Sequence, residues 1–237
     1  MSYEKTYIFD LVNKLKSEKE PEKFLEKEWP LIKKRVLGLD YARRQMAKGF
    51  QLALEGLKLA YPQIDLEEAN FLGTSDRMAR AYIEMCSGLG VKDEDVFSQT
   101  FPIGPYEEMI VLKDIEYTSL CNHHFFPFVG HAHIGYIPGA KKKKSKVVGL
   151  SKLARIVDVH ARRPQLQERM SADILKAIEG QLRPAGAIIV LEGKHSCMGC
   201  RGPQKPGATM VTTAVGGRFA ESQSLRTEFI SVINHRS

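Results

Sequence analysis

The amino-acid sequence predicts an α+β protein whose helices and strands are segregated along the chain. Three observations support this prediction. Apolar residues keep helical spacing from about residue 20 to residue 60, strand-like composition begins near residue 109, and two helical stretches separate the first pair of strands from a second pair. A doubly wound sheet would require strands and helices to alternate regularly, and this sequence lacks that alternation.

The N-terminal part of the chain is predicted to be helical. Apolar residues recur there three or four positions apart, with Lys and Arg between them, at Ala47, Phe50, Leu54 and Leu57. Tyr61-Pro62 closes this run, and Thr74 is expected to cap a further helix that ends near Gly88. We therefore divide the chain into a helical extension over residues 1–66 and a second domain over residues 67–237.

The second domain contains the predicted strands. Four segments are rich in β-branched, aromatic or other apolar residues, namely residues 109–120, 125–137, 185–198 and 209–219. Between the second and third, one helix is expected to open at Ser151 and a second to follow the interruption at Pro164. The four consecutive lysines Lys141 to Lys144 are expected at a solvated hairpin tip.

Charge and hydropathy exclude two classes of partner. The formal net charge is +7, but outside the lysine run the basic residues are scattered and no basic stripe interleaved with aromatics appears, so nucleic-acid binding is not expected. No stretch approaches the roughly 18 unbroken apolar residues of a membrane span. The first residues lack the layout of a signal peptide, so we expect a cytoplasmic protein with no membrane partner.

The four cysteines are Cys86, Cys121, Cys197 and Cys200. Without an export signal they argue against a disulfide framework and leave buried, catalytic or metal-binding roles. Cys86 falls in a predicted helix and is expected to fill the core.

The densest group of metal ligands is Cys121-Asn122-His123-His124 at the end of one predicted strand, with His195-Ser196-Cys197 near the end of another. Zinc prefers thiolate and imidazole ligands, and catalytic zinc sites keep three protein ligands and an open position. Cys121, His124 and Cys197 would supply three. The alternative is a closed structural site in which Cys200 is the fourth ligand, and the spacing alone leaves both readings open.

His123 and His195 lie next to, or two residues from, these proposed ligands without being needed as ligands. An imidazole beside a metal-bound water can exchange protons close to neutral pH. The alternative for each is a histidine with a structural role only.

A phosphate-binding group is indicated in Gly149-Leu150-Ser151-Lys152-Leu153-Ala154-Arg155, where a turn opens into a helix. Free amides at a helix start, with Lys152 and Arg155 on one face, suit a phosphate chain, and a serine cap with solvated charges is the alternative. Gln167-Glu168 opens the next helix. A carboxylate there either favours the first helical turn or accepts hydrogen bonds from a buried guanine.

Four segments resemble the GTP cyclohydrolase I family in their order and nearly in their spacing. They are SLCNHHFFPFVGHAHIGYIP, VVGLSKLARIVDVHARRPQLQERM, HSCMGCRG and TTAVGGRF. The similarity covers about residues 74–230 and begins at TSDRMARAYIEMCSGL, which is similar to the family's Thr-Pro-x-Arg helix. Because several independent motifs agree, the chain is identified as a member of this family.

The resemblance implies a role for each candidate residue. The family's zinc ligands fall on Cys121, His124 and Cys197. Its two proton-handling histidines fall on His123 and His195, its guanine clamp falls on Gln167 and Glu168, and Cys200 lies where the family uses no ligand. The positions that hold ribose and triphosphate are Ser151, Lys152, Arg155 and Arg201.

The resemblance also implies the tunnelling fold, in which an antiparallel four-stranded sheet and two helices follow one another as ββααββ. Such units associate into a barrel, and the implied assembly is a homodecamer with active sites between subunits. The implied reaction is zinc-dependent hydrolytic opening of the guanine imidazole ring of GTP, which releases formate and forms 7,8-dihydroneopterin triphosphate. On this basis residues 67–237 form the catalytic domain, GTP is the expected substrate and Zn²⁺ the expected cofactor.

The chain departs from the family at Asn122, where the family usually has glutamate. Asparagine cannot ionise, so the site loses one negative charge and a lower rate is expected. The alternatives are an enzyme that stops at the formylated intermediate or uses a modified purine nucleotide, and a weakly active regulatory subunit that binds GTP or pterin. The retained His123, His195 and Glu168 argue against the regulatory subunit.

Overall fold

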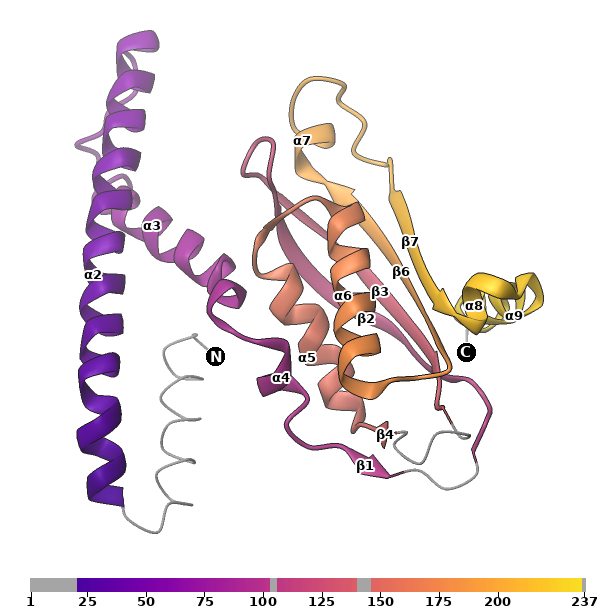
Figure 1. Ribbon diagram of the computed structural model, residues 1–237. Coiled ribbons are helices and arrows are strands. Elements are labelled where there is room, and N and C mark those ends of the chain that lie inside the picture. Colours follow the sequence, from indigo (N-terminus) through magenta and orange to yellow (C-terminus); the bar gives the residue numbers. More distant parts are fainter. Residues whose placement is uncertain (1–20, 103–105, 140–145, 236–237) are drawn as a thin grey trace. The chain divides into compact units, whose positions relative to one another are not determined.

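A computed structural model describes residues 21–102, 106–139 and 146–235 of the chain (Figure 1). Lys141 to Lys144, for which a hairpin tip was predicted, lie outside the described residues. The chain divides into two compact units, Met1–Glu84 and Met85–Ser237. No helix in the described ranges is long and apolar enough to cross a membrane.

The first unit is helical, as the apolar spacing predicted. Helix α2 spans Pro21–Ala60, and α3 spans Thr74–Met85. The two helices are joined by an ion pair between Arg43 and Asp76 and by stacking of Phe50 on Tyr82, whose ring centroids lie 5.3 Å apart. The proposed division of the chain at residue 66 stays a prediction.

The second unit contains a five-stranded sheet in the order β5-β2-β3-β6-β7, with antiparallel pairing except between β2 and β5. Its strands are β2 (Ile110–Cys121), β3 (Pro127–Ile137), β5 (Pro164–Gln165), β6 (Gly186–His195) and β7 (Met210–Gly217). Helices α5 (Leu150–Ala161) and α6 (Gln167–Leu182) separate the two long strand pairs in the sequence. This order and pairing confirm the predicted α+β fold with its ββααββ unit.

Shorter elements complete the second unit. They are η1 (Ser87–Gly90), α4 (Asp93–Val96), the paired β1 (Phe101–Pro102) and β4 (Lys146–Val147), α7 (Ser196–Gly199), α8 (Arg218–Glu221) and α9 (Gln223–Asn234). Helix α9 was not predicted from the sequence. It begins where the Ser222 hydroxyl accepts a hydrogen bond from the Leu225 amide at 3.3 Å.

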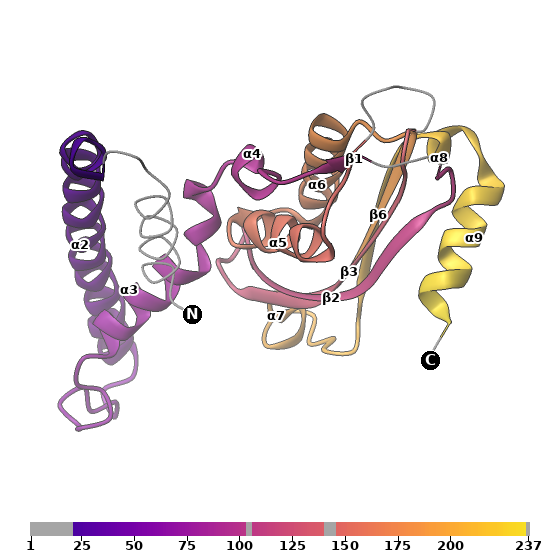
Figure 2. The ribbon, with the colours of Figure 1, turned by 90° about the horizontal axis from the view of Figure 1, so that it is seen from below.

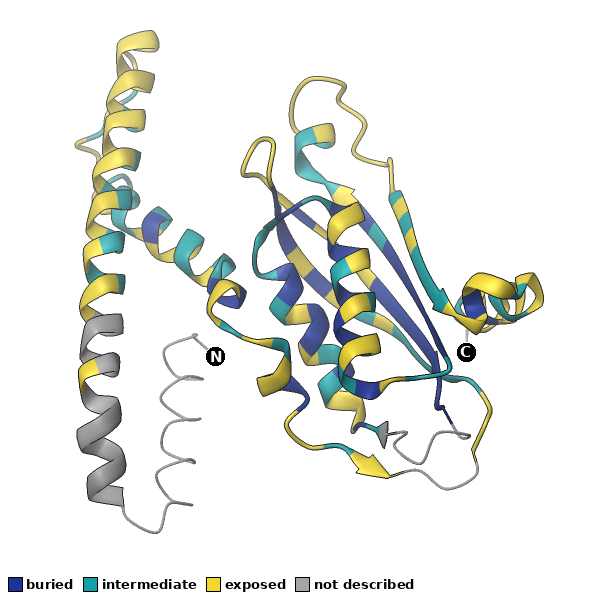
Figure 3. Cartoon of the chain, in the orientation of Figure 1, coloured by how far each residue is buried: buried dark blue, intermediate teal, exposed yellow. Residues whose placement is uncertain are grey.

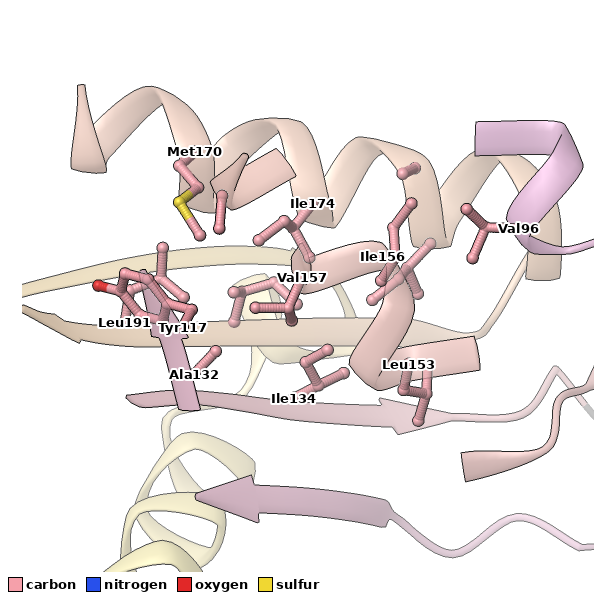
Figure 4. Packing of buried hydrophobic residues seen from close by; sticks show 14 of the residues in the cluster. Val96, Tyr117, Ala132, Ile134, Leu153, Ile156, Val157, Met170, Ile174 and Leu191 are labelled. Atoms are coloured by element: carbon pink, nitrogen blue, oxygen red, sulfur yellow. The ribbon is translucent and has the colours of Figure 1, made fainter. Parts of the chain in front are cut away.

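The main core lies between the sheet and the pair α5 and α6. Alternate residues of β3, such as Ala132 and Ile134, point toward these helices. Ile174 and Ile178, four residues apart on α6, pack in the same core. Figure 2 shows α5 and α6 on one side of the sheet and α9 on the other, and Figure 4 shows the side chains that fill the layer.

A second, smaller core lies on the opposite face of the sheet. There α8 and α9 supply Phe219 and Phe229, which pack with Ile188 and Val190 of β6. Figure 3 shows that β6 is buried along most of its length, whereas the neighbouring edge strand β7 is half-buried or exposed. The sheet is thus covered by α5 and α6 on one face and by α8 and α9 over part of the other.

Candidate metal centre and active site

Strand register brings the candidate residues to one end of the sheet. The β2–β3 hairpin pairs Leu120 with Pro127, and β3 then pairs Phe128 with His195 at the end of β6. The parallel strand β5 pairs Gln165 with Cys121, which brings the first turn of α6 to the same end. Segments that are distant in the sequence, such as those of Cys121 and Cys197, therefore meet here.

Three donor atoms, one each from Cys121, His124 and Cys197, lie within 4.8 Å of one another. Cys121 is buried at the end of β2, Cys197 is half-buried in α7, and His124 is exposed in the hairpin turn. Cys200 is exposed and does not belong to this group. Among the described residues, the arrangement favours the open three-ligand site over the closed four-ligand site.

The donor chemistry fits zinc. Two thiols and one imidazole are ligands that Zn²⁺ prefers, and the exposed side of His124 leaves room for a further ligand. Burial, together with the neighbouring Cys121, raises the pKa of the Cys197 thiol above its usual value. The Cys197 thiol so placed resists ionisation until a nearby cation offsets its charge, which suits it to binding a metal ion.

His195 is held from two sides. Its ring stacks on Phe128 with centroids 4.2 Å apart and an interplanar angle of 6°, and its Nε2 lies 3.0 Å from Gln167 Oε1. Burial lowers the pKa of His195, while Glu168 opposes this shift and His123 adds to it. Phe128 was not predicted as a partner of His195, because only the strand register places its ring beside the imidazole.

His123 and His124 follow Cys121 in the hairpin turn and are both exposed. His123 Nδ1 lies 3.9 Å from Cys121 Sγ, and the His124 ring stacks on Phe126 with centroids 6.3 Å apart. The side chain of Asn122 is exposed, and its backbone amide donates to the Gln165 carbonyl at 3.0 Å. The turn thus presents one predicted proton-handling imidazole and one predicted ligand together.

The two residues of the predicted guanine clamp differ in exposure. Glu168 is exposed in the first turn of α6, close enough to His195 to affect its pKa. Gln167 is only 1% exposed, and its amide is bonded within the protein. Of these two residues, Glu168 is therefore the one that presents its polar group to a ligand.

The predicted phosphate-binding residues of α5 do not join the metal centre within one chain. Ser151 is exposed and Lys152 half-buried in the first turn of α5, and Ser151 lies about 15 Å along the axis from the last residue of the helix. Arg155 is exposed one turn further along, about 9 Å from that residue. The end of α5 is the one that leads to Gln165 beside Cys121. Figure 1 shows the first turn of α5 following β4, at the end of the sheet opposite α7.

Arg201 lies on the metal side. It is exposed in the loop after α7, and its charge opposes the rise in the Cys197 pKa. Arg201 is thus the member of the predicted phosphate-binding set that the fold brings near the three donor atoms.

Comparison with known proteins identifies the family. A family model described as GTP cyclohydrolase I matches residues 57–234, which is well over half of the chain. The chain belongs to the GTP cyclohydrolase I family. The match includes every candidate residue named above and begins within α2.

Three similar members of the GTP cyclohydrolase I family are bacterial proteins named GTP cyclohydrolase 1. The Streptomyces avermitilis protein is 49% identical over 163 residues, covering 69% of this chain and 79% of its own. The Thermobifida fusca protein is 46% identical over 169 residues, covering 71% and 80%. The Clostridium perfringens protein is 42% identical over 182 residues, covering 76% and 95%.

A solved structure, archaeosine synthase QueF-Like in the apo form, is also similar. It covers 46% of this chain and 93% of its own at 17% identity, with a TM-score of 0.37. At this level the likeness says nothing of the activity, so the family assignment rests on the sequence relatives.

Proposed function

We propose that the chain has the activity for which its family is named, the hydrolytic opening of the guanine imidazole ring of GTP. The products are formate and 7,8-dihydroneopterin triphosphate. The observation that carries the proposal is the open group of Cys121, His124 and Cys197 with two further imidazoles and a free carboxylate at the same end of the sheet. A purely structural metal site needs neither the imidazoles nor the carboxylate.

Zn²⁺ is the proposed cofactor, held by Cys121, His124 and Cys197. When bound, zinc acidifies a coordinated water and polarises the bond under attack. The protein itself positions the three donors. Cys121 is buried at the end of β2, His124 lies in the turn between β2 and β3, and Cys197 follows β6, which pairs with β3.

His195 is proposed to deliver a proton to N7 of the guanine. Its lowered pKa makes the protonated ring a stronger acid than an ordinary histidinium, which suits proton donation to a ring nitrogen. The stack on Phe128 fixes the ring plane and so the direction of transfer. His123, beside Cys121 Sγ, is proposed as the second proton-handling group.

Glu168 is proposed to recognise guanine. An exposed carboxylate near His195 can accept hydrogen bonds from N1–H and the exocyclic amine together, a pattern that adenine does not offer. Ser151, Lys152, Arg155 and Arg201 are proposed to hold the ribose and triphosphate.

The active site is proposed to form between subunits of a homo-oligomer, as a decamer. Two observations support this. Ser151 and Lys152 lie in the first turn of α5, at the end of the helix remote from the metal centre of their own chain. Within the described ranges, β7 pairs on one side only and β5 covers only two residues of β2, so both sheet edges offer unpaired backbone to a neighbouring copy.

The proposal is tested by supplying GTP to the zinc-loaded protein and following formate together with pterin fluorescence. Equimolar formate and pterin are expected, with little product from ATP. Loss of GTP without formate would instead identify an enzyme that stops at the formylated intermediate. Absence of any GTP turnover would refute the proposed activity.

A further inference from the structure

The buried amide of Gln167 has every polar atom engaged by the protein. Its Nε2 lies 3.1 Å from the Leu191 carbonyl, 3.0 Å from the Met210 carbonyl and 3.3 Å from Thr212 Oγ1. Its Oε1 lies 3.0 Å from His195 Nε2. A buried side chain so connected contributes to the order of the site and does not act as a free ligand.

The partners of Gln167 fix which way its amide points. Two of them are backbone carbonyls of β6 and β7, which can only accept hydrogen bonds, so the donor Nε2 must face them. The reversed amide would place Oε1 against both carbonyl oxygens in a buried position and leave Nε2 facing His195. Backbone atoms of two strands therefore set the orientation of Gln167, and Oε1 must face the imidazole.

An amide oxygen accepts but cannot donate, so the hydrogen bond to Gln167 requires a hydrogen on His195 Nε2. We infer that Gln167 is a positioning residue that holds His195 in the Nε2–H tautomer and leaves Nδ1 to exchange the proton with the substrate. The catalytic part of this inference rests on the proposed function, whereas the tautomer rests on the hydrogen bonds alone.

The surrounding strands are shaped for this contact. A Cβ at Gly193 would lie 2.3 Å from Gln167 Oε1 and 3.0 Å from Tyr117 Oη, so a larger residue would push the amide away from the imidazole. Tyr117 Oη in turn donates to the Glu192 carbonyl at 3.1 Å. Glycine at position 193 thus leaves the space through which Gln167 reaches His195.

This role separates Gln167 from Glu168. If Gln167 contacted guanine, it would have to give up hydrogen bonds to Leu191, Met210 or His195 at a buried position. Glu168 carries no such constraint, because its side chain is exposed. The guanine contact therefore falls to Glu168, and Gln167 acts through His195.

Solid-state NMR of the zinc-loaded protein, labelled with [¹⁵N]histidine and held at alkaline pH, measures the tautomer directly. The chain has 7 histidines, and the difference from His195→Asn assigns the signal of interest. We expect a protonated Nε2 and a bare Nδ1 for His195. A protonated Nδ1, or equal amounts of both tautomers, would overturn the inference whether or not the protein turns over GTP.

Variants test the cause of this preference. Gln167→Met removes the acceptor and should leave a mixture of tautomers, whereas the matched control Thr212→Val removes one of three Nε2 partners and should keep the Nε2–H form. If Gln167→Met does not fold, the wild-type spectrum still decides, because a protonated Nδ1 on His195 contradicts the inference.

Kinetics then separate positioning from substrate contact. A misdirected imidazole should lower kcat of Gln167→Met by about 10- to 100-fold and leave the KM for GTP within about twofold of the wild type. A raised KM with kcat retained would show that Gln167 contacts guanine, and would contradict the positioning role. If the wild-type protein does not turn over GTP, the proposed function is refuted. The tautomer of His195 is then still decided by the NMR measurement.

Discussion

Cys197 and Cys200 lie three residues apart, but only the sulfur of Cys197 lies beside the donor atoms of Cys121 and His124. We therefore predict that Cys197→Ala loses bound zinc, because two remaining ligands hold the ion weakly. Cys200→Ala is the matched control and should retain one zinc per chain. Elemental analysis of the purified variants gives the answer, and zinc lost from Cys200→Ala but kept in Cys197→Ala would reverse the ligand assignment.

Glu168 offers a second prediction at this scale. Glu168→Ala should leave the N1–H and amine of guanine without an acceptor, a loss of about 1–3 kcal/mol that raises the KM for GTP roughly 5- to 150-fold. The exposed neighbour Arg169 provides the control, since Arg169→Ala should change the KM little. Steady-state kinetics with GTP and ATP measure the KM of both variants. An unchanged KM for GTP in Glu168→Ala would argue against guanine recognition by Glu168.

At the scale of elements, the sequence predicted most of the catalytic unit because its signals are local. The β-branched and aromatic composition of β2 and β3 depends on near neighbours in the chain. So do the helix start at Ser151 and the interruption at Pro164, which delimit α5 and α6. Helix α9 was missed, although Leu225, Phe229 and Ile233 recur four residues apart and pack as one face. The helical signal was therefore present in the sequence.

The site was predictable only in part. Thiolates and imidazoles are typical metal ligands, so the three candidate ligands could be predicted from the sequence. The burial of Gln167 and the stacking of Phe128 on His195 could not be predicted. Both depend on the strand register and on where α6 begins. Likewise, only the length of α5 reveals that its phosphate-binding residues lie away from the metal centre of the same chain.

The contact between α4 and α5 gives a prediction about pH. His160 is 3% exposed, its Nε2 lies 3.1 Å from Asp93 Oδ1, and its buried Nδ1 has no hydrogen-bond partner in the described part of the chain. Burial lowers the pKa of His160, and Arg163 adds to this, against the opposing effects of Asp93 and Asp173. The unfolded chain therefore binds a proton below about pH 6.5 that the folded chain resists.

Stability should accordingly fall as the pH drops below about 6.5, by at most about 1.4 kcal/mol per pH unit for this one proton. His160→Gln removes the titrating group and should make the fall less steep. Burial lowers the pKa of His133 as well, so a residual slope of the same sign is expected. Urea unfolding between pH 7.5 and 5, in a Cys197→Ala background that excludes metal release, measures the slope; an equal slope in His160→Gln contradicts the assignment.

For the whole molecule, the separation of Lys152 from the metal centre predicts complementation between chains. Lys152→Ala and Cys197→Ala should each be inactive as homo-oligomers. Co-assembled in equal amounts, they should regain about one quarter of wild-type activity, because that fraction of sites combines an intact metal centre with an intact neighbour. Formate release by the mixed oligomer measures this, and no activity above the parents would show that both groups act from one chain.

Zinc titration of the metal-free protein tests whether the group of Cys121, His124 and Cys197 carries the activity. Formate release from GTP should rise in proportion to added zinc and level off at one zinc per chain, because each chain provides one group of Cys121, His124 and Cys197. Cys197→Ala should stay inactive throughout the titration. Full activity of the metal-free protein, or zinc bound at this site with no formate released, would contradict a catalytic role for zinc at these three residues.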